Sequence, residues 1–275
     1  MAVHYQHAKL MLPGPFVPLH QQNLMLHEGD VELARQTFLE RRPTNLEFLL
    51  STRFSWMNDY LTNARDIVEV GSGHGLIREF LKNPALKLSD VVKRPWTDLV
   101  VDALNTPFPD ASLDVIIASH MIHHLAHPLK FFREAARVLR PGGYLLIVDI
   151  NTSLFMRLIL RIMRHEGWSY NVDVFDENCV ANDPADPWSA NCAIPEMLFE
   201  DKARFEAAVP AFKVKLSKPC EFLLMPLSGG VVAKTRTINL PRPVLHAMHQ
   251  LDNLLTKLMP QVFAFGRRVV LERTD

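Results

Sequence analysis

Residues 66–75, Asp-Ile-Val-Glu-Val-Gly-Ser-Gly-His-Gly, constrain the fold more than any other stretch of the chain. A short β-branched run that leads directly into three alternating glycines predicts a buried strand followed by a tight turn. This turn must bend sharply, expose its N–H groups and let a helix begin at once, and a Cβ would hinder each of these. We therefore expect the backbone at Gly71, Gly73 and Gly75 to approach a ligand.

The spacing of the glycines separates two kinds of nucleotide-binding turn. Rossmann dinucleotide sites carry Gly-x-Gly-x-x-Gly, and the third glycine would fall at position 76, where this chain has Leu76. A nicotinamide-dependent reductase is therefore a disfavoured alternative. An ordinary glycine-rich turn without a ligand is the other alternative, and each matching motif further along the chain weakens it.

Strand and helix patterns alternate from residue 66 to residue 149. By the right-handed crossover rule, this alternation predicts a parallel sheet with helices on both faces. The expected strands are residues 66–70, 86–92, 99–101, 113–118 and 144–150, and the expected helices are residues 75–81 and 128–139. Residues 140–143, Arg-Pro-Gly-Gly, end the second helix and turn the chain into the fifth strand.

The flanking segments predict further elements. Residues 1–30 are expected to form an extended arm, because Pro13, Pro15 and Pro18 oppose a long helix. Helical patterns then cover residues 31–39 and 46–60. After the fifth strand we expect helices at 154–164, 196–209 and 244–259, an irregular loop at 171–195, a turn at 228–230, and strands at 212–216 and 262–271.

Taken together, these motifs resemble those of the class I S-adenosylmethionine-dependent methyltransferases. The resemblance rests on Glu69-x-Gly71-x-Gly73-x-Gly75 and on residues 114–119, 121–125 and 136–143, which follow in the family's order. It implies an α/β domain with a doubly wound, seven-stranded Rossmann-like sheet whose last strand is antiparallel. The expected division is an N-terminal arm and helical cap over residues 1–62 and a methyltransferase domain over 63–275. Insertions after the fifth strand are expected at about 151–195 and 217–259.

The resemblance also implies S-adenosylmethionine as the cofactor. Glu69 would help to anchor its methionine end, and the glycines would pass beneath it. Asp90, or less favourably Asp98, would accept both ribose hydroxyls. Asp102 and Ala103 would contact the adenine. The full expected cofactor-binding set is Glu69, Gly71, Ser72, Gly73, Gly75, Asp90, Val91, Asp102, Ala103 and Ser119.

Four histidines follow the fourth strand, whose carboxyl end borders the cofactor in doubly wound sheets; they are His120, His123, His124 and His127. Methyl transfer to a hydroxyl requires removal of a proton, so we expect His123 or His124 to be the base. Asp149 ends the neighbouring fifth strand and would orient that imidazole.

Other roles compete with that of a base. Metal coordination is one alternative for histidines four positions apart on a helix. We expect no metal, because the sequence places no carboxylate or cysteine cluster beside them. A solvated or core role is a further alternative, and it is the preferred one for His127.

Composition narrows the class of acceptor. Lys+Arg and Asp+Glu balance at 30 each, so no bulk charge favours a nucleic-acid substrate. The two insertions would roof a pocket at the carboxyl ends of the strands. We expect O-methylation of a small-molecule or lipid-linked acceptor, for example a sugar hydroxyl. A catalytically silent module that binds the cofactor only structurally remains an alternative, because intact binding residues do not separate the two.

Cysteine usage and hydropathy bear on the compartment. Cys179, Cys192 and Cys220 form no CxxC pair, which favours a reducing environment. The chain shows neither a signal-peptide pattern nor a run of about 18 apolar residues, so we expect a cytoplasmic protein. Helix 154–164 has an apolar face and an arginine face. We expect it to be a lid over the site, and peripheral contact with an anionic membrane is the alternative.

Overall fold

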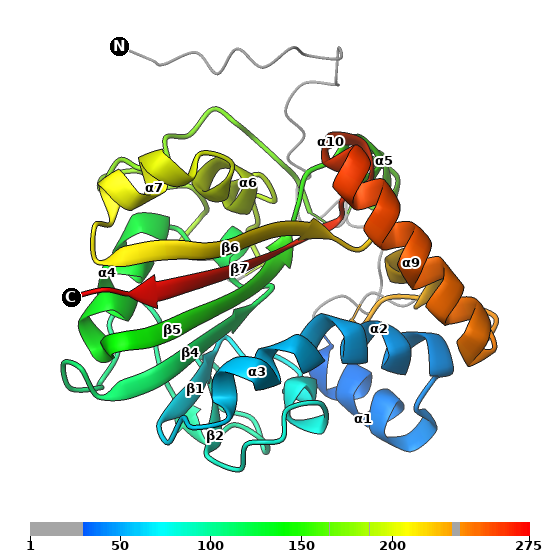
Figure 1. Cartoon of the computed structure of the whole chain (residues 1–275), viewed down its shortest axis with the longest axis horizontal. Helices are drawn as coiled ribbons and strands as arrows, with labels where there is room; N and C mark the ends of the chain where they lie inside the picture. The colour runs from blue at the N-terminus through cyan, green and yellow to red at the C-terminus, as the bar shows by residue number, and fades with distance from the viewer. Residues whose placement is uncertain (1–29, 165, 187, 233–236) are drawn as a thin grey trace.

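The computed structural model describes residues 30–164, 166–186, 188–232 and 237–275 (Figure 1). The arm expected at residues 1–30 lies outside them, apart from Asp30. A seven-stranded sheet forms the centre of the molecule. Its strands are β1 (Ile67–Val70), β2 (Leu86–Asp90), β3 (Leu99–Val100), β4 (Leu113–Ser119), β5 (Leu139–Ile150), β6 (Phe212–Cys220) and β7 (Gly266–Arg273).

The order of the strands across the sheet is β3-β2-β1-β4-β5-β7-β6. The first five strands pair in parallel, and β7 lies antiparallel between β5 and β6. The expected doubly wound sheet with an antiparallel last strand is therefore confirmed. Because the order reverses beside β1, the carboxyl ends of β1 and β4 border the crevice where such sheets bind ligands.

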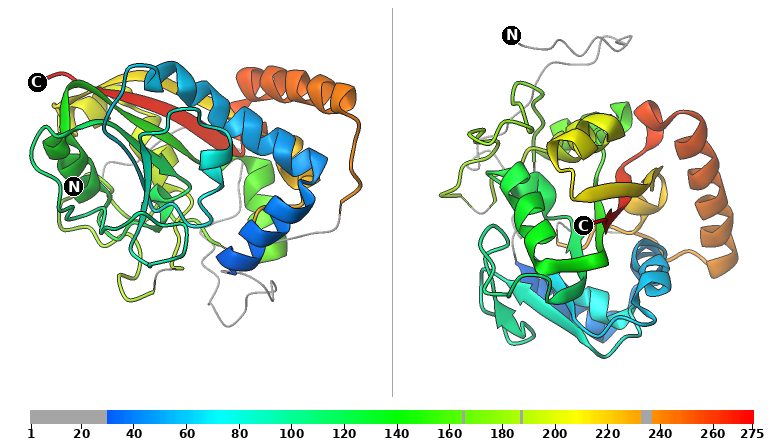
Figure 2. Two further views of the ribbon diagram at one scale, coloured as in Figure 1. Left: turned by 90° about the horizontal axis from the view of Figure 1, so that it is seen from below. Right: turned by 60° about the vertical axis from the view of Figure 1, so that its left-hand side comes forward.

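Helices cover both faces of this sheet (Figure 2). The longer helices are α1 (Val31–Arg41), α2 (Thr44–Phe54), α4 (Pro128–Val138), α5 (Leu154–Met163) and α9 (Arg242–Leu258). The shorter ones are α3 (Asn58–Leu61), α6 (Ile194–Phe199), α7 (Lys202–Ala208), α8 (Leu224–Leu227), α10 (Pro260–Phe263) and the 3-10 turns η2 (Ser55–Met57), η3 (Leu76–Glu79) and η4 (Ile122–His124). Among the described residues, no helix combines the length and apolar character needed to cross a membrane.

Successive residues of β1 supply two different cores, because side chains of a strand alternate between the faces of its sheet. Val68 faces the core formed with α4, α6 and α7, where Phe132 and Phe205 are fully buried. Ile67 faces the core formed with α1 and α2, where Phe54 is buried. The even coverage of both faces explains why the central strands are apolar throughout.

Several element boundaries differ from those expected. The helix predicted at 75–81 is only the 3-10 turn η3, which follows Gly75 in a left-handed conformation. The helix predicted at 196–209 is two helices, because Asp201 caps a new helix by accepting a hydrogen bond from the N–H of Arg204. The strand predicted at 262–271 begins at Gly266, since Pro260 starts α10. The helix predicted at 46–60 is divided into α2, η2 and α3.

The N-terminal helices are joined to the second insertion. The side-chain amide of Asn45 in α2 donates hydrogen bonds to the carbonyls of Leu227 and Ile238 and accepts one from the N–H of Leu240. An apolar cluster of Leu49, Leu224 and Leu245 packs beside them. These segments therefore hold one another in place, and the carboxyl ends of β5 and β6 point toward α5, α9 and α10 (Figure 1).

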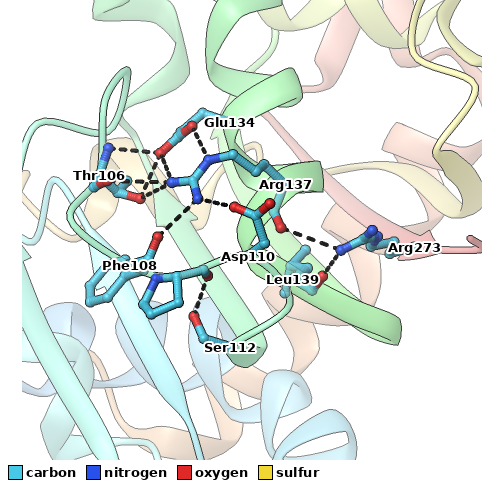
Figure 3. Close-up of polar contacts among 9 residues, drawn as sticks. Thr106, Phe108, Asp110, Ser112, Glu134, Arg137, Leu139 and Arg273 are labelled. Atoms are coloured by element: carbon cyan, nitrogen blue, oxygen red, sulfur yellow. Dashed lines mark hydrogen bonds and ion pairs between the residues drawn. The ribbon is translucent and has the colours of Figure 1, made fainter.

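At the amino end of β4, polar contacts join α4 to the turn that precedes this strand (Figure 3). The Arg137 guanidinium donates to the carbonyl of Phe108 and the carboxylates of Asp110 and Glu134. Thr106 donates to Glu134 through both its N–H and its hydroxyl. This network fixes the position of α4 against the sheet.

Candidate active site

The glycine turn after β1 needs glycine for two physical reasons. Gly71, Gly73 and Gly75 have φ values of 66°, 49° and 60°, in the left-handed region that disfavours other residues. A Cβ added at Gly71 would lie 2.5 Å from Cγ of Met121. A Cβ at Gly75 would lie 2.6 Å from Cδ1 of Trp96. The turn therefore has a left-handed backbone conformation that favours glycine, and it packs closely against Met121 and Trp96.

Polar contacts hold this turn from three sides. The N–H of Gly73 donates to Oδ2 of Asp90 at 2.8 Å, and Nε1 of Trp96 donates to the carbonyl of Gly73 at 2.9 Å. Arg35 of α1 donates to the carbonyl of His74, and its guanidinium lies 5.0 Å from the centre of the Trp96 ring. The sequence interpretation missed Trp96 and Arg35, because their approach depends on tertiary packing.

Glu69 places a buried carboxyl beside the turn. Glu69 is only 3% exposed, and its Oε2 has no hydrogen-bond partner in the described part of the chain. Burial, with a smaller contribution from the charge of Asp90, raises the pKa of Glu69 to about 8. A buried acceptor without a partner fits a site that a cationic ligand group completes, as the methionine end of S-adenosylmethionine would.

The other expected cofactor residues gather at the same edge. Asp90 is buried at the end of β2, where it accepts hydrogen bonds from the N–H groups of Gly73 and Val92 and lies 3.4 Å from Nη1 of Arg94. Asp102 is exposed after β3 and accepts a hydrogen bond from the N–H of Leu104. The remaining expected residues near these strand ends are Ser72, Val91, Ala103 and Ser119.

Asp90 thus orders the glycine turn directly, a contact that the sequence did not reveal. Arg94, four positions after Asp90, is a further residue that the sequence interpretation missed. The charge of Arg94 compensates the Asp90 carboxylate in a partly closed environment, with side chains 14% and 11% exposed.

His123 and Asp149 form the pair expected from the neighbouring strand ends. Nδ1 of His123 lies 2.5 Å from Oδ1 of Asp149, and both residues are buried. Asp149 also accepts hydrogen bonds from the N–H groups of Ile122 and Ile150. Although burial disfavours its charged form, the charges of Asp149 and Glu166 raise the pKa of His123 to about 10.

The other three histidines do not contact Asp149 through a hydrogen bond. Nδ1 of His124 lies 3.1 Å from the carbonyl of Ser189, and burial together with the charge of His123 lowers the pKa of His124 to about 4. Nδ1 of His127 lies 3.0 Å from the carbonyl of Cys179. His120 is half-buried with φ of 49°, and its buried Nε2 has no hydrogen-bond partner among the described residues.

Glu166 joins this cluster from the first insertion. Its Oε1 lies 3.7 Å from Nε2 of His123 and 3.9 Å from Nε2 of His124. We expected no metal because no carboxylate accompanied the histidines, and that premise is wrong. The sequence gave no local signal for Glu166, because the loop that carries it reaches the histidines only through tertiary contacts.

Comparison with known proteins places this geometry in a family. Residues 68–147 match the model of the family described as the methyltransferase domain. Over residues 68–147 the chain is therefore similar to methyltransferase domains. One relative is named a probable S-adenosylmethionine-dependent methyltransferase, from Mycolicibacterium smegmatis; it is 31% identical over 103 residues, 33% of this chain and 40% of the relative.

A solved structure shares the fold of the methyltransferase domain. The S-adenosylmethionine-dependent methyltransferase from Archaeoglobus fulgidus superposes with a TM-score of 0.51 and 18% sequence identity. The alignment covers 86% of this chain and 99% of the archaeal one. At this identity the likeness shows a common architecture.

Sequence relatives match shorter segments. The 27-O-demethylrifamycin SV methyltransferase of Amycolatopsis mediterranei is 50% identical over 48 residues, which is 18% of each chain. A phthiotriol/phenolphthiotriol dimycocerosates methyltransferase of Mycobacterium ulcerans is 48% identical over 52 residues, 19% of each chain. The malonyl-[acyl-carrier protein] O-methyltransferase of Hahella chejuensis is 31% identical over 112 residues, 34% of this chain and 39% of the relative. The matched segments thus span less than half the length of these relatives.

Proposed function

We propose that the protein transfers a methyl group from S-adenosylmethionine to a hydroxyl of a small-molecule or lipid-linked acceptor. The observation that carries this proposal is the buried Oε2 of Glu69, which lies beside the left-handed glycine turn and has no hydrogen-bond partner among the residues that the structure describes. When bound, the cofactor supplies a methyl group on a positively charged sulfur. The protein then has to hold the cofactor, align the acceptor oxygen and receive its proton.

The chain offers specific groups for holding the cofactor. Glu69 would pair with the ammonium group, and Asp90 would accept the ribose hydroxyls while it fixes the N–H of Gly73. Asp102, exposed at the end of β3, would accept from the adenine amine. The glycine turn would pass beneath the cofactor, with Ser72, Val91, Ala103 and Ser119 around it.

The acceptor class is supported by charge and by the names of the relatives. The chain has no net charge to attract nucleic acid, and the names of its relatives state methylation of a rifamycin, of phthiotriol lipids and of a malonyl group on a carrier protein. Two of these three acceptors are lipids or acyl groups. A small or lipid-linked hydroxyl is therefore the class that we propose.

The proposed base is His123 or His124, with Asp149 as the orienting group. The 2.5 Å contact between His123 and Asp149 supports His123, which must first lose a proton to act as a base because its pKa is raised to about 10. His124, whose pKa is lowered to about 4, is neutral at pH 7 and is the more exposed of the two, with 23% of its side chain accessible. General base catalysis contributes about 10²–10⁴-fold, so alanine at the true base should lower kcat by that factor. Unchanged kcat in His123→Ala, His124→Ala and Asp149→Asn would remove the dyad from the mechanism.

Cofactor binding is the direct test of the proposal. We expect calorimetry to show binding of S-adenosylhomocysteine to the wild type, and loss of that binding in Gly71→Ala, where the new Cβ would collide with Met121. Gly142→Ala is the matched control, because Gly142 has a φ of 78° but open space around it. Binding of NADH without any response to S-adenosylhomocysteine would overturn the proposal in favour of a reductase.

Turnover separates an enzyme from a silent binding module. We expect the wild type to transfer a labelled methyl group from S-adenosylmethionine to a small-molecule or lipid fraction of a cell extract. Gly71→Ala should abolish this transfer, whereas Gly142→Ala should retain it. Cofactor binding without transfer to any fraction would favour the module.

We further propose peripheral membrane contact, as a lipid-linked acceptor would require. The outer faces of α5 and α9 expose Leu158, Ile162 and Leu258 at 51%, 65% and 65%, with Arg161 and Lys257 also exposed. Apolar side chains next to cations suit the surface of an anionic bilayer. Sedimentation with phosphatidylserine vesicles should bind the wild type more strongly than Ile162→Ser/Leu258→Ser, and equal binding would contradict this contact.

The inner face of α5 bears on its predicted role as a lid. Met156 and Leu160 pack in one cluster with Ile150 and Cys192, at the carboxyl end of β5. That position supports a cover over the acceptor side of the site, and the lid stays a proposal beside the membrane contact.

A further inference from the structure

We propose that His123, His124 and Glu166 bind a divalent transition-metal cation, with zinc as the best match to their chemistry. One ligand atom from each residue, Nε2 of both histidines and a carboxylate oxygen of Glu166, lies within 4.8 Å of the other two. Two imidazoles and one carboxylate with a position left for a fourth ligand form a recurrent zinc-binding set.

The second polar atom of each residue is already held in the orientation that a ligand needs. Nδ1 of His123 is 2.5 Å from Asp149, and Nδ1 of His124 is 3.1 Å from the carbonyl of Ser189. Both contacts are to acceptors, so each Nδ1 carries a proton and each Nε2 faces Glu166, where a bound cation would take the place of the second proton that the neighbouring carboxylates favour on His123. Ligand histidines are commonly oriented by a carboxylate or a backbone carbonyl in this way.

A hydrogen bond to its second oxygen also orients the carboxylate of Glu166. The thiol of Cys192 lies 3.4 Å from Oε2 of Glu166 and donates to it, while Oε1 faces the histidines. Cys192 therefore positions Glu166 and is not one of the three ligands.

The separations within the cluster fit ligands around a cation better than direct hydrogen bonds. The distances of 3.7 Å and 3.9 Å from Oε1 of Glu166 to the two Nε2 atoms exceed hydrogen-bonding range. Ligands about 2.0–2.2 Å from a tetrahedral zinc lie about 3.4 Å apart. Shifts of a few tenths of an ångström would therefore bring Oε1 of Glu166 to that separation from each Nε2, and the two histidine atoms, which lie within 4.8 Å of each other, would also have to move together.

The first insertion is anchored so that Glu166 stays near the histidines. The side-chain amide of Asn182 and the N–H of Asn191 both donate to the carbonyl of His123, at 2.8 Å and 2.9 Å. The N–H of Cys192 also donates to the carbonyl of Gly167, next to Glu166. These bonds join the loop to η4 without using any ligand atom.

The ligand types select among cations. Magnesium and calcium prefer sites made of oxygen ligands, whereas imidazole nitrogen with carboxylate oxygen suits zinc and its transition-metal neighbours. His123 is 2% exposed and the side chains of Glu166 and His124 are 13% and 23% exposed, so the site is shielded but reachable. An acceptor oxygen could occupy the fourth position.

The binding of an acceptor oxygen at the fourth position of the metal rests on the proposed O-methylation and deepens it. A hydroxyl bound to zinc loses its proton more readily than a free one. With the cation bound, His123 and His124 act as ligands in place of the base role proposed above, and the acceptor proton passes to solvent. The O–CH₃ bond then forms as the bond from the methyl carbon to sulfur breaks, leaving a neutral thioether.

The test uses the full chain, freed of metal with a chelator and titrated with Co²⁺ and then with Zn²⁺. We expect one equivalent of Co²⁺ to give a visible absorption band, which Zn²⁺ displaces. His124→Ala and Glu166→Gln should weaken binding by more than about 100-fold, and Asp149→Asn by about 10–100-fold. His127→Ala is the matched control, since His127 lies on the same segment but outside the cluster.

Two outcomes would overturn the metal site. One is less than a tenth of an equivalent bound by the folded wild type, and the other is equal binding by the wild type, His124→Ala and Glu166→Gln. Calorimetry with S-adenosylhomocysteine on the metal-free wild type and on each metal-free variant provides the separate readout. Cofactor binding there would leave the methyltransferase proposal standing even if the metal site failed, and would show that the variants are folded.

Discussion

We expect Glu69 to couple cofactor binding to pH. Because burial raises its pKa to about 8, Glu69 is mostly protonated in the free protein at neutral pH. An ammonium group placed beside it would favour the ionised carboxylate and so lower that pKa. Binding of S-adenosylhomocysteine should therefore release a proton below about pH 8. The affinity should increase by up to about tenfold per pH unit as pH increases toward 8, and then level off.

Calorimetry in buffers with different ionisation enthalpies would measure this proton release. Glu69→Gln should bind more weakly and with little dependence on pH, because it has no proton to lose. Asp98→Asn serves as the control, since Asp98 pairs with Arg78 outside the turn. A wild-type affinity that stays constant from about pH 6 to about pH 8 would contradict the coupling.

For individual residues of the candidate site, the sequence indicated those at strand ends better than those on loops. Glu69 and the pairing of Asp149 with a histidine followed from strand positions, because adjacent strands bring their carboxyl ends together. Glu166, Arg94 and Trp96 were missed. Their side chains reach the site through loop conformations that depend on distant contacts, and no local pattern encodes those.

Helix α4 carries a prediction at the scale of the element. Glu134 accepts hydrogen bonds from Arg137 and, at 2.8 Å and 2.7 Å, from the N–H and hydroxyl of Thr106. These contacts lower the pKa of Glu134 to about 2, below the 4.5 of the unfolded chain. Its contribution to stability is therefore present above about pH 4.5 and is lost as pH falls toward 2.

Glu134→Gln should lower the melting temperature at pH 7 by about 2–4 °C, and should reduce the further loss between pH 4.5 and 2. Glu177→Gln is the comparison, because Glu177 pairs with Arg133 on an exposed surface, where ion pairs contribute little. Equal melting curves for Glu134→Gln and wild type at pH 7 would show that the network does not stabilise α4.

The elements that differed from expectation carried signals that compete with hydrophobic periodicity. Asp201 is a typical helix N-cap and Pro260 a typical first helical residue, so the breaks at α7 and α10 could have been predicted. The short η3 could not, because its length depends on how Trp96 and α1 cover the glycine turn.

A buried ion pair connects distant parts of the whole molecule. Arg53 of α2 donates to the carboxylate of Glu221, just after β6, through Nε at 2.9 Å and through Nη2, with both side chains almost inaccessible. Arg53→Ala would leave the Glu221 charge buried without this partner. We expect it to lower the free energy of unfolding by about 3–5 kcal/mol.

Urea unfolding of a double-mutant cycle would measure the coupling. Arg53→Met/Glu221→Leu removes both charges and keeps apolar bulk, so it should be more stable than Arg53→Met alone. If the two substitutions instead lower stability additively, the pair contributes nothing beyond its separate members.

For the molecule as a whole, the alternation of strands and helices was enough to predict the sheet. The placement of the insertions was not, because helices joined by irregular loops dock wherever their apolar faces find a partner. Asn45 and the cluster of Leu49, Leu224 and Leu245 show this, since they unite N-terminal helices with a segment far along the chain. Dividing the chain at residue 62 remains a proposal.

The contacts of Trp96 give the protein a built-in fluorescent reporter. Its indole nitrogen is bonded to the carbonyl of Gly73, and Arg35 lies over its ring. Indole emission responds to nearby charge and to hydrogen bonding. A ligand that shifts the glycine turn would therefore change the tryptophan signal at the site itself, without an attached dye.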